Sequence, residues 1–330
     1  MIAVLRNLVF LAIGGLLLWL TFRHQDFSLV WEKVKTANPW FIALCCLCSM
    51  AALISRAMRW VQLIEPLGYR PRLSTTYHAV MFGYLANMAI PRLGEISRCG
   101  ALSKSDGVPF EKLIGTVIVE RLMDVLMLLL CIILTALLEF DRLGAFLMEH
   151  IFQPLLDKVG NSSLLIVLAG GFFVAGMYLL FRLFKMLNPP AFILKIKNLA
   201  GGVAEGLRSF TKVKNKGLFL FHTFFIWSMY FAMSYVCFFA LPETYGLGAS
   251  AALFIMVLGG IGMTAPVQGG IGTYHLLVSK GLLLYGLSET DGIVYATMSH
   301  TVSTLLLILL GAISMIVLFF FVKNRNHPAA

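Results

Sequence analysis

The sequence predicts an all-α polytopic membrane protein with about six spanning helices, two oppositely oriented re-entrant hairpins and an inverted repeat. Of its 330 residues, 59% are hydrophobic and 13% are charged, whereas about 25% of residues are charged in a typical soluble domain. The mean hydropathy is +0.86. Long apolar runs recur along the chain, and shorter ones are interrupted by proline and glycine. Together these observations exclude an ordinary soluble domain.

Six apolar segments are long enough to span a bilayer, because about 20 helical residues cross a hydrocarbon core about 30 Å thick. They are residues 5–22, 39–57, 113–139, 163–183, 218–241 and 292–322. The first follows Arg6 and resembles a signal peptide. It is nevertheless predicted to be an uncleaved span, because residues 21–23 offer no small-residue cleavage site.

Three apolar stretches are too short to span comfortably: 74–90, 248–263 and 273–286. The first ends at Pro91 and Gly94, and a Pro- and Gly-rich break that contains Pro266 separates the other two. Proline removes a backbone donor and glycine loosens the chain, so a helix is expected to end at each break. The sequence therefore predicts re-entrant hairpins at 74–95 and 248–286. Their breaks require surrounding protein or a water-filled cavity.

Basic residues are distributed unevenly between the predicted loops. With the N-terminus inside, nineteen Lys and Arg residues fall on the cytoplasmic side and five outside. The positive-inside rule therefore places both termini in the cytoplasm, with 141–162 as an external loop and 323–330 as a cytoplasmic tail. The basic linker 184–217 is either a surface helix that touches anionic headgroups or a plain orientation signal. Because the net charge of +10 gathers in these loops, nucleic acid is not predicted as a partner.

The predicted elements repeat in the order span, span, hairpin, span. This order occurs over 1–140 and again over 163–322, with the first unit starting inside and the second outside. The breaks share a Pro-x-x-Gly-x-Ile spacing, at residues 91–96 and 266–271. Inverted repeats with broken helices are typical of alternating-access carriers.

Glu120, Arg121 and Asp124 lie inside the apolar run 113–139. At that depth each charge costs about 2.5–3.5 kcal/mol on insertion scales, so these side chains must face protein or water. Helical spacing allows Arg121 to pair with Asp124. The group is either a structural ion pair that locks two helices or a polar site inside the membrane.

The two predicted breaks each carry a candidate site. The first consists of Asn87, Pro91, Arg92, Gly94, Glu95 and Arg98. Its arginines could bind a phosphate through two parallel hydrogen bonds, although Arg98 is better explained as a loop residue that follows the orientation bias. The second consists of Pro266, Gly269, Gly270, Gly272 and Thr273. Its backbone N–H groups, at the start of a half-helix, could cradle an anion.

The remaining ionisable residues of the predicted membrane segments are His275, Lys280 and His300. The histidines could relay protons or simply pack, and Lys280 could extend to the surface.

The six cysteines form no C-x-x-C pair and are expected to be packing residues, without a metal. The sequence has no P-loop, G-x-S-x-G, H-E-x-x-H or nucleotide-binding fingerprint. Neither a cofactor nor ATP-driven transport by this chain alone is therefore predicted.

Three motifs together resemble the lysylphosphatidylglycerol synthase transmembrane-region family. They are N-x-x-x-P-R-x-G-E-x-x-R over 87–98, E-R-x-x-D over 120–124 and P-x-x-G-G-x-G over 266–272. The resemblance covers essentially the whole chain. It implies the flippase-type membrane domain of multiple peptide resistance factors, in a bacterial inner membrane and without the soluble aminoacyl-transfer domain. Family members usually carry Glu where His275 stands and often Arg where His300 stands.

The favoured hypothesis is a lipid translocase that acts on a phosphate-bearing or anionic lipid. Arg92 and Arg121 would bind phosphate, Glu95, Glu120 and Asp124 would balance them, and the second break would gate. A membrane enzyme with Glu95 or Asp124 as base, and a non-transporting scaffold, are the alternatives. A homo-oligomer is left open.

Overall fold

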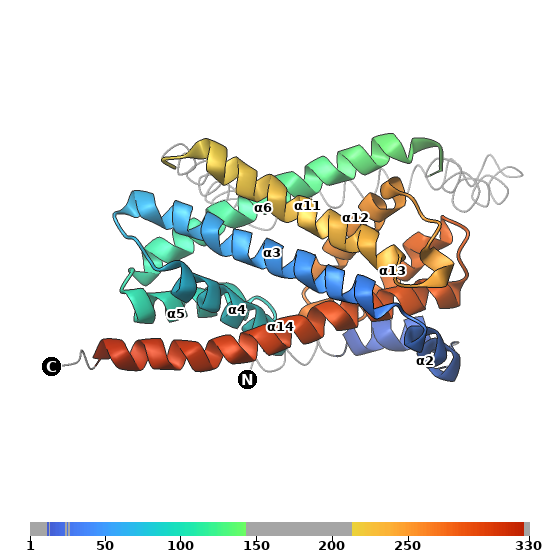
Figure 1. Cartoon of the computed structure of the whole chain (residues 1–330), viewed down its shortest axis with the longest axis horizontal. Helices are drawn as coiled ribbons and strands as arrows, with labels where there is room; N and C mark the ends of the chain where they lie inside the picture. The colour runs from blue at the N-terminus through green and yellow to red at the C-terminus, as the bar shows by residue number, and fades with distance from the viewer. Residues whose placement is uncertain (1–11, 13, 24, 26, 143–212, 327–330) are drawn as a thin grey trace, which may run out of the picture.

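The computed structural model describes residues 12, 14–23, 25, 27–142 and 213–326 (Figure 1). Its main elements are α2 (Phe27–Lys35), α3 (Pro39–Ile64), α4 (Leu73–Ala89), α5 (Leu93–Asp106), α6 (Phe110–Leu138), α11 (Lys216–Phe238), α12 (Ala249–Thr264), α13 (Thr273–Leu283) and α14 (Glu289–Asn326). Residues 14–22 are also helical. The all-α prediction is therefore confirmed for the described part of the chain. The predicted span 163–183 and most of the linker 184–217 lie outside it.

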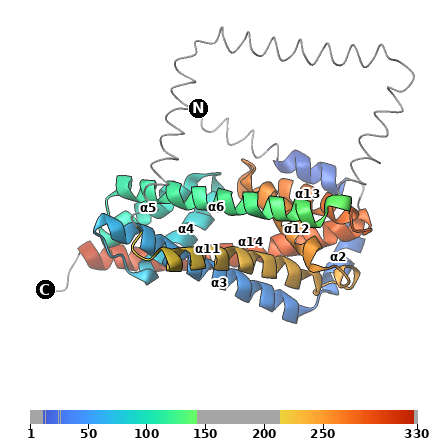
Figure 2. The same cartoon turned by 90° about the horizontal axis from the view of Figure 1, so that it is seen from above.

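Four long helices run side by side and form the body of the molecule (Figures 1 and 2). α3 and α14 run in one direction and α6 and α11 in the other, with α3 packed against α11. Within the described residues, three helical stretches are long and apolar enough to cross a membrane: Pro39–Leu67, Lys216–Phe238 and Glu289–Phe321. α6, which holds the predicted charged group, is 29 residues long, and its length is about 43 Å by helical rise.

The starts of the long helices follow from local sequence. Asn38 precedes α3, and its side chain accepts a hydrogen bond from the Trp40 backbone N–H at 3.0 Å, with Pro39 in the first turn. Asn215 caps α11 in the same way by accepting from the Leu218 N–H at 3.0 Å. Both caps satisfy a backbone donor that the helix itself cannot pair. α3 continues to Ile64, past the predicted end at 57.

Two pairs of shorter helices fill the space between the long ones. α4 packs against α5 towards one end of the bundle, and α12 packs against α13 towards the other (Figure 1). A break over 90–92 joins α4 to α5, and a break over 265–272 joins α12 to α13. The breaks meet within the bundle, where a Cβ on Gly269 would lie 2.6 Å from the Met88 sulfur.

The second helix pair matches the residues predicted for it, but the first is longer than predicted. Its second helix, α5, runs to Asp106 rather than ending near residue 95. α5 is largely polar in sequence, so a search for apolar runs could not find it.

Glycines set how closely α4 and α5 approach. A Cβ on Gly83 would lie 2.8 Å from the carbonyl oxygen of Gly94. A Cβ on Gly94 would overlap the Gly83 carbonyl oxygen and the Asn87 side chain. The two helices can therefore cross this closely only because both contacting residues, Gly83 and Gly94, lack a side chain.

We expect Gly94→Ala to destabilise the protein, since the added methyl group forces α4 and α5 apart at a cost of about 1–3 kcal/mol. Gly100→Ala is the matched control, because it lies on the same helix and its Cβ would have no neighbour within 4 Å. That control should be neutral, or more stable by up to about 1 kcal/mol through helix propensity. Thermal unfolding in detergent measures both. Equal melting temperatures would contradict the close approach of α4 and α5.

The two ends of the bundle differ in charge. Where α3 and α14 end, the described basic residues are Arg70, Arg72, Lys104, Lys112, Lys214 and Lys216, against the acidic Glu65, Asp106 and Glu111. At the opposite end, Lys33 lies 2.9 Å from Glu243 and also pairs with Asp291. Hydrogen bonds to Asp291 and Glu243 raise the pKa of Lys33 above its ordinary value. The two ion pairs of Lys33 join α2 to the loop after α11 and to the start of α14.

Candidate functional site

Two helices bring opposite charges together in the interior of the bundle. Arg56 on α3 contacts Glu120 on α6 at 2.6 Å and Asp124 at 2.9 Å. Arg59, one turn further along α3, contacts Asp124 at 2.7 Å and Glu120 at 3.6 Å. Each pair of residues shares one face of its helix because of the i,i+3 and i,i+4 spacing. The two arginines of α3 thus balance the negative charge of the two carboxylates of α6.

Arg98 on α5 adds a third buried guanidinium. It lies 3.0 Å from Glu120, and its guanidinium carbon is 4.6 Å from the centre of the Trp60 ring. Only 4% of the Arg98 side chain is exposed. The interpretation of Arg98 as a loop residue was therefore wrong. α5 folds back into the bundle, and the side chain pairs with a buried carboxylate instead of facing the cytoplasm.

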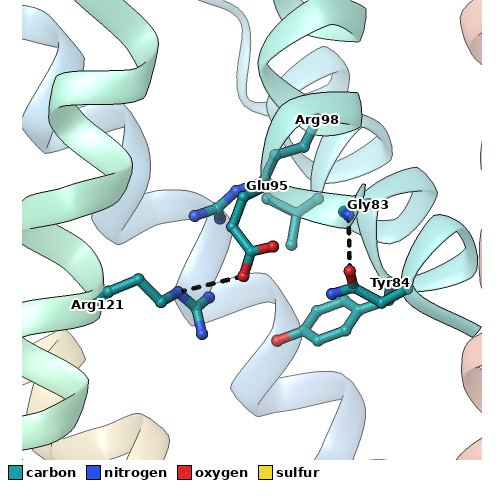
Figure 3. Close-up of a pocket in the computed structure, with 8 residues that line it drawn as sticks. Gly83, Tyr84, Glu95, Arg98 and Arg121 are labelled. Carbon is teal, nitrogen blue, oxygen red and sulfur yellow. Dashed lines mark hydrogen bonds and ion pairs between the residues drawn. The ribbon is translucent and has the colours of Figure 1, made fainter. Parts of the chain in front are cut away.

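Arg121 is the exposed member of the group. It lies 3.5 Å from Glu120, 3.7 Å from Asp124 and 4.0 Å from Glu95, and 45% of its side chain is exposed. Figure 3 shows it reaching from α6 towards Glu95 on α5. The pairing with Asp124 that helical spacing predicted is seen, and Arg121 also approaches the first break through Glu95. Its pairs are longer than those of Arg56 and Arg59.

Sequence reasoning missed Arg56 and Arg59 as site residues. Both were counted with the basic residues of the cytoplasmic side, although Arg56 falls within the predicted span, which ended at residue 57. The signal that could have found them is the helical spacing of large apolar residues beyond that point, at Trp60, Leu63 and Ile64. All three of those apolar side chains are buried, so the helix continues with its arginines inside. Neither arginine belongs in the count of loop charges.

A cavity of about 580 Å³ lies among α3, α6, α11, α12, α14 and both breaks. Its charged lining residues are Arg56, Arg92, Glu95, Arg121 and Asp124. Three arginines face two carboxylates, so the lining carries one positive charge in excess. Uncharged polar residues join them, including Tyr84, Asn87, Tyr230, Ser299, His300, Ser303 and Thr304.

The cavity is amphipathic and elongated. Along α3 its lining residues run from Ile42 to Arg56, a distance of about 21 Å by helical rise. Apolar and sulfur-containing side chains form most of the wall away from the arginines, including Ile42, Cys45, Leu128, Met233, Ile255, Val302 and Leu306. This arrangement suits a ligand with one charged end and a long apolar remainder.

The first break is held by Asn87. The Asn87 side-chain oxygen accepts a hydrogen bond from the Gly94 backbone N–H at 2.6 Å, across the break. Arg92 lies between them with φ of 65°, a conformation that costs a non-glycine residue roughly 1–3 kcal/mol. Its side chain is exposed and lines the cavity. The Glu95 Oε2 atom is buried without a hydrogen-bond partner.

The second break is built from three glycines with positive φ: Gly269, Gly270 and Gly272. His300 donates a hydrogen bond through Nε2 to the Gly269 carbonyl oxygen at 2.8 Å. Thr273 donates to the carbonyl oxygens of Gly262 at 2.7 Å and Gly270 at 3.1 Å. These bonds fix the turn from several sides.

Two backbone donors of the predicted anion cradle are used inside the turn itself. The Gly270 N–H donates to the Val267 carbonyl at 3.4 Å, and the Ile271 N–H donates to the Gln268 carbonyl at 3.0 Å. The shared Pro-x-x-Gly spacing also conceals different geometries. Gly94 lies in the first turn of α5, whereas Gly269 lies in a turn with φ of 56°.

The predicted site residues divide into three groups. Those that line the large cavity are Asn87, Pro91, Arg92, Glu95, Arg121, Asp124, Pro266, Gly269, Gly270 and His300. Gly94 and Arg98 line a small pocket of about 20 Å³ between α4, α5 and α6 (Figure 3). The residues that line neither space are Glu120, Gly272, Thr273 and His275.

The two histidines lie next to each other, with ring centres 4.8 Å apart. His275 is buried, and its Nδ1 atom has no hydrogen-bond partner. His300 alone of this pair reaches the cavity. Lys280, by contrast, pairs with Glu289 at 2.5 Å, and both side chains are about half exposed.

Among the described residues, no cluster of three or more His, Cys, Asp or Glu side chains could hold a metal ion. All six cysteines are free thiols. Cys45 is buried, and its thiol donates to the Met233 carbonyl at 3.4 Å. The polar groups that line the large cavity include guanidinium, carboxylate, phenol, imidazole, amide, hydroxyl and thiol groups.

These features define a class: an all-helical membrane protein whose interior cavity, lined by two broken helix pairs, carries an excess of arginine. The chain belongs to the lysylphosphatidylglycerol synthase TM region family, whose family model matches residues 7–311. No curated protein and no solved structure matches the chain.

Proposed function

We propose that the protein moves a polar-headed, phosphate-bearing lipid between the two leaflets of a membrane. The observation that carries the proposal is the large cavity, because it combines excess positive charge with a long apolar wall. A lipid has the same two parts. Membership of a family named for a lipid synthase supports lipid as the class of substrate.

Arg92 and Arg121 are the proposed phosphate ligands. The other three arginines are less available to a substrate, because each is buried and lies within 3.0 Å of a carboxylate: Arg56, Arg59 and Arg98. Arg121 makes looser pairs and is half exposed. No ion pair joins Arg92 to another described residue. Arg92 also directly precedes α5, where the helix dipole favours an anion.

The two broken helix pairs, α4–α5 and α12–α13, would act as oppositely oriented re-entrant hairpins. In this proposal 1–140 and 163–322 form the two units of an inverted repeat, and the cavity at their interface is exposed to each side in turn. The excess of basic residues where α3 and α14 end supports a cytoplasmic location for that end and for both termini. The membrane would be a bacterial inner membrane.

Substitution of Arg92 tests the proposal. Arg92→Lys keeps the charge but loses the two parallel hydrogen bonds to phosphate, so lipid translocation should fall. Arg92→Ala should lower it further, by about tenfold or more, since a charge-assisted hydrogen bond contributes about 1.5–3 kcal/mol. Translocation of a labelled phospholipid in proteoliposomes, normalised to folded protein, measures both.

Arg70→Ala is the control, because it removes an exposed arginine outside the cavity. It should translocate lipid at the parental rate. All Arg92 variants should keep near-parental thermal stability, since the side chain is exposed. Equal normalised rates in Arg92→Ala and Arg70→Ala would remove Arg92 from the site.

A further inference from the structure

The cavity has an open side. Most of its lining residues are wholly or partly buried, but six of them are exposed: Arg92, Arg121, Val125, Met263, Thr264 and Pro266. They come from the first break, from the middle of α6, and from the end of α12 with the second break. The exposed members therefore mark one opening rather than scattered positions.

The breaks explain why the opening lies there. α6 packs against α5 on part of its length and against α12 on another part, as Figures 1 and 2 show. α5 begins only at Leu93 and α12 ends at Thr264. The two breaks, where neither short helix is present, lie between those two points. Val125, which lines the cavity, is near the midpoint of this 29-residue helix.

The surface around the opening is apolar. On α6, Ile118, Leu126, Leu129 and Leu130 are all exposed large apolar residues. In a bilayer, an apolar surface at the middle of a helix about 43 Å long faces hydrocarbon. In a membrane, the opening would therefore face lipid chains.

We infer that this opening is a lateral portal for the acyl chains of the substrate lipid. The inference rests on the proposed function. In a phospholipid the phosphate lies between the headgroup and the chains, and Arg92 and Arg121 lie at the rim between cavity and portal. When the phosphate is bound to these arginines, the headgroup lies inside the cavity. The chains then pass between Val125 and Met263 to the outer surface of α6.

A bulky side chain at the rim tests the portal. Val125→Trp places an indole at the opening, whereas Leu126→Trp places one on the next residue of α6, which is similarly exposed at 45% against 52% but does not line the cavity. We expect Val125→Trp to slow translocation by about tenfold or more relative to Leu126→Trp, because an indole is a large and rigid obstacle.

Met263→Trp and Ile261→Trp form a second matched pair, for use if Val125→Trp fails to fold. Both residues are exposed on α12, and only Met263 lines the cavity. Met263→Trp should again be the slow member. Equal normalised rates within the pair that folds would overturn the portal.

A chain-free ligand separates failure of the portal from failure of the proposed function. Glycerol phosphate has the phosphate but no acyl chains, so it should raise the melting temperature of the parent and of Val125→Trp alike, and not that of Arg92→Ala. If it stabilises the parent while Val125→Trp translocates lipid normally, the phosphate site stands and the portal is wrong. If it stabilises none of the variants and no lipid moves, the proposed function fails, and the portal fails with it.

Discussion

Glu120→Ala should prevent the protein from accumulating in a folded form. Glu120 is fully buried and lies within 3.6 Å of four arginines: Arg56, Arg59, Arg98 and Arg121. Removing it leaves Arg98 without its carboxylate partner and leaves Asp124 to balance the other three. Breaking a buried ion pair by deleting one partner costs about 3–5 kcal/mol, which is comparable with the whole stability of many domains.

The yield of monodisperse protein in detergent, measured by size-exclusion chromatography, tests this expectation. Glu111→Ala is the matched control, because Glu111 lies on the same helix but is exposed. It should give the parental yield. Comparable yields of folded protein from Glu120→Ala and Glu111→Ala would show that the cluster does not hold α3, α5 and α6 together.

Arg121→Ala should have the opposite profile, with near-normal stability and little or no translocation. Sequence analysis alone would expect its loss to leave the buried carboxylates unpaired. In the structure the closer partners of these carboxylates are Arg56, Arg59 and Arg98. Arg121 is therefore available to bind a ligand in the cavity. In this variant the unfolding temperature should therefore stay near the parental value, while the normalised rate of lipid translocation falls.

Arg98→Ala is the comparison for Arg121→Ala. It removes a buried guanidinium with a 3.0 Å partner, and should lower the melting temperature markedly. If Arg121→Ala is as unstable as Arg98→Ala and keeps its activity per folded molecule, then Arg121 is a structural residue and the proposed site loses one of its two phosphate ligands.

The parts of the fold that follow from apolar runs and from proline and glycine could be predicted from sequence. The helix pair α12–α13 and its break were visible because two apolar stretches flank a Pro- and Gly-rich segment. α5 and the last part of α3 were not visible. Both carry charges that are buried only because a partner helix supplies the counter-charge, and that partner is set by tertiary packing.

The candidate site was predictable to a similar degree. The sequence placed Glu120, Arg121 and Asp124 within an apolar helix, where charge demands a partner. It could not identify Arg56 and Arg59 as the partners, because they are more than 60 residues away along the chain. Nor could it separate Asn87 and Thr273, which hydrogen-bond the backbone at the breaks, from residues available to a ligand.

In the proposed function, the cavity carries a lipid across the membrane without changing it. The most direct test reconstitutes the purified protein in liposomes that contain a labelled phospholipid, follows the label from the inner to the outer leaflet, and then measures the mass of the recovered lipid. We expect rapid movement and unchanged lipid mass with the parent, and no movement with the double variant Arg92→Ala/Arg121→Ala. A change in mass would indicate a lipid-modifying enzyme instead. Label that stays in its leaflet, at the rate of protein-free liposomes, would contradict transport altogether.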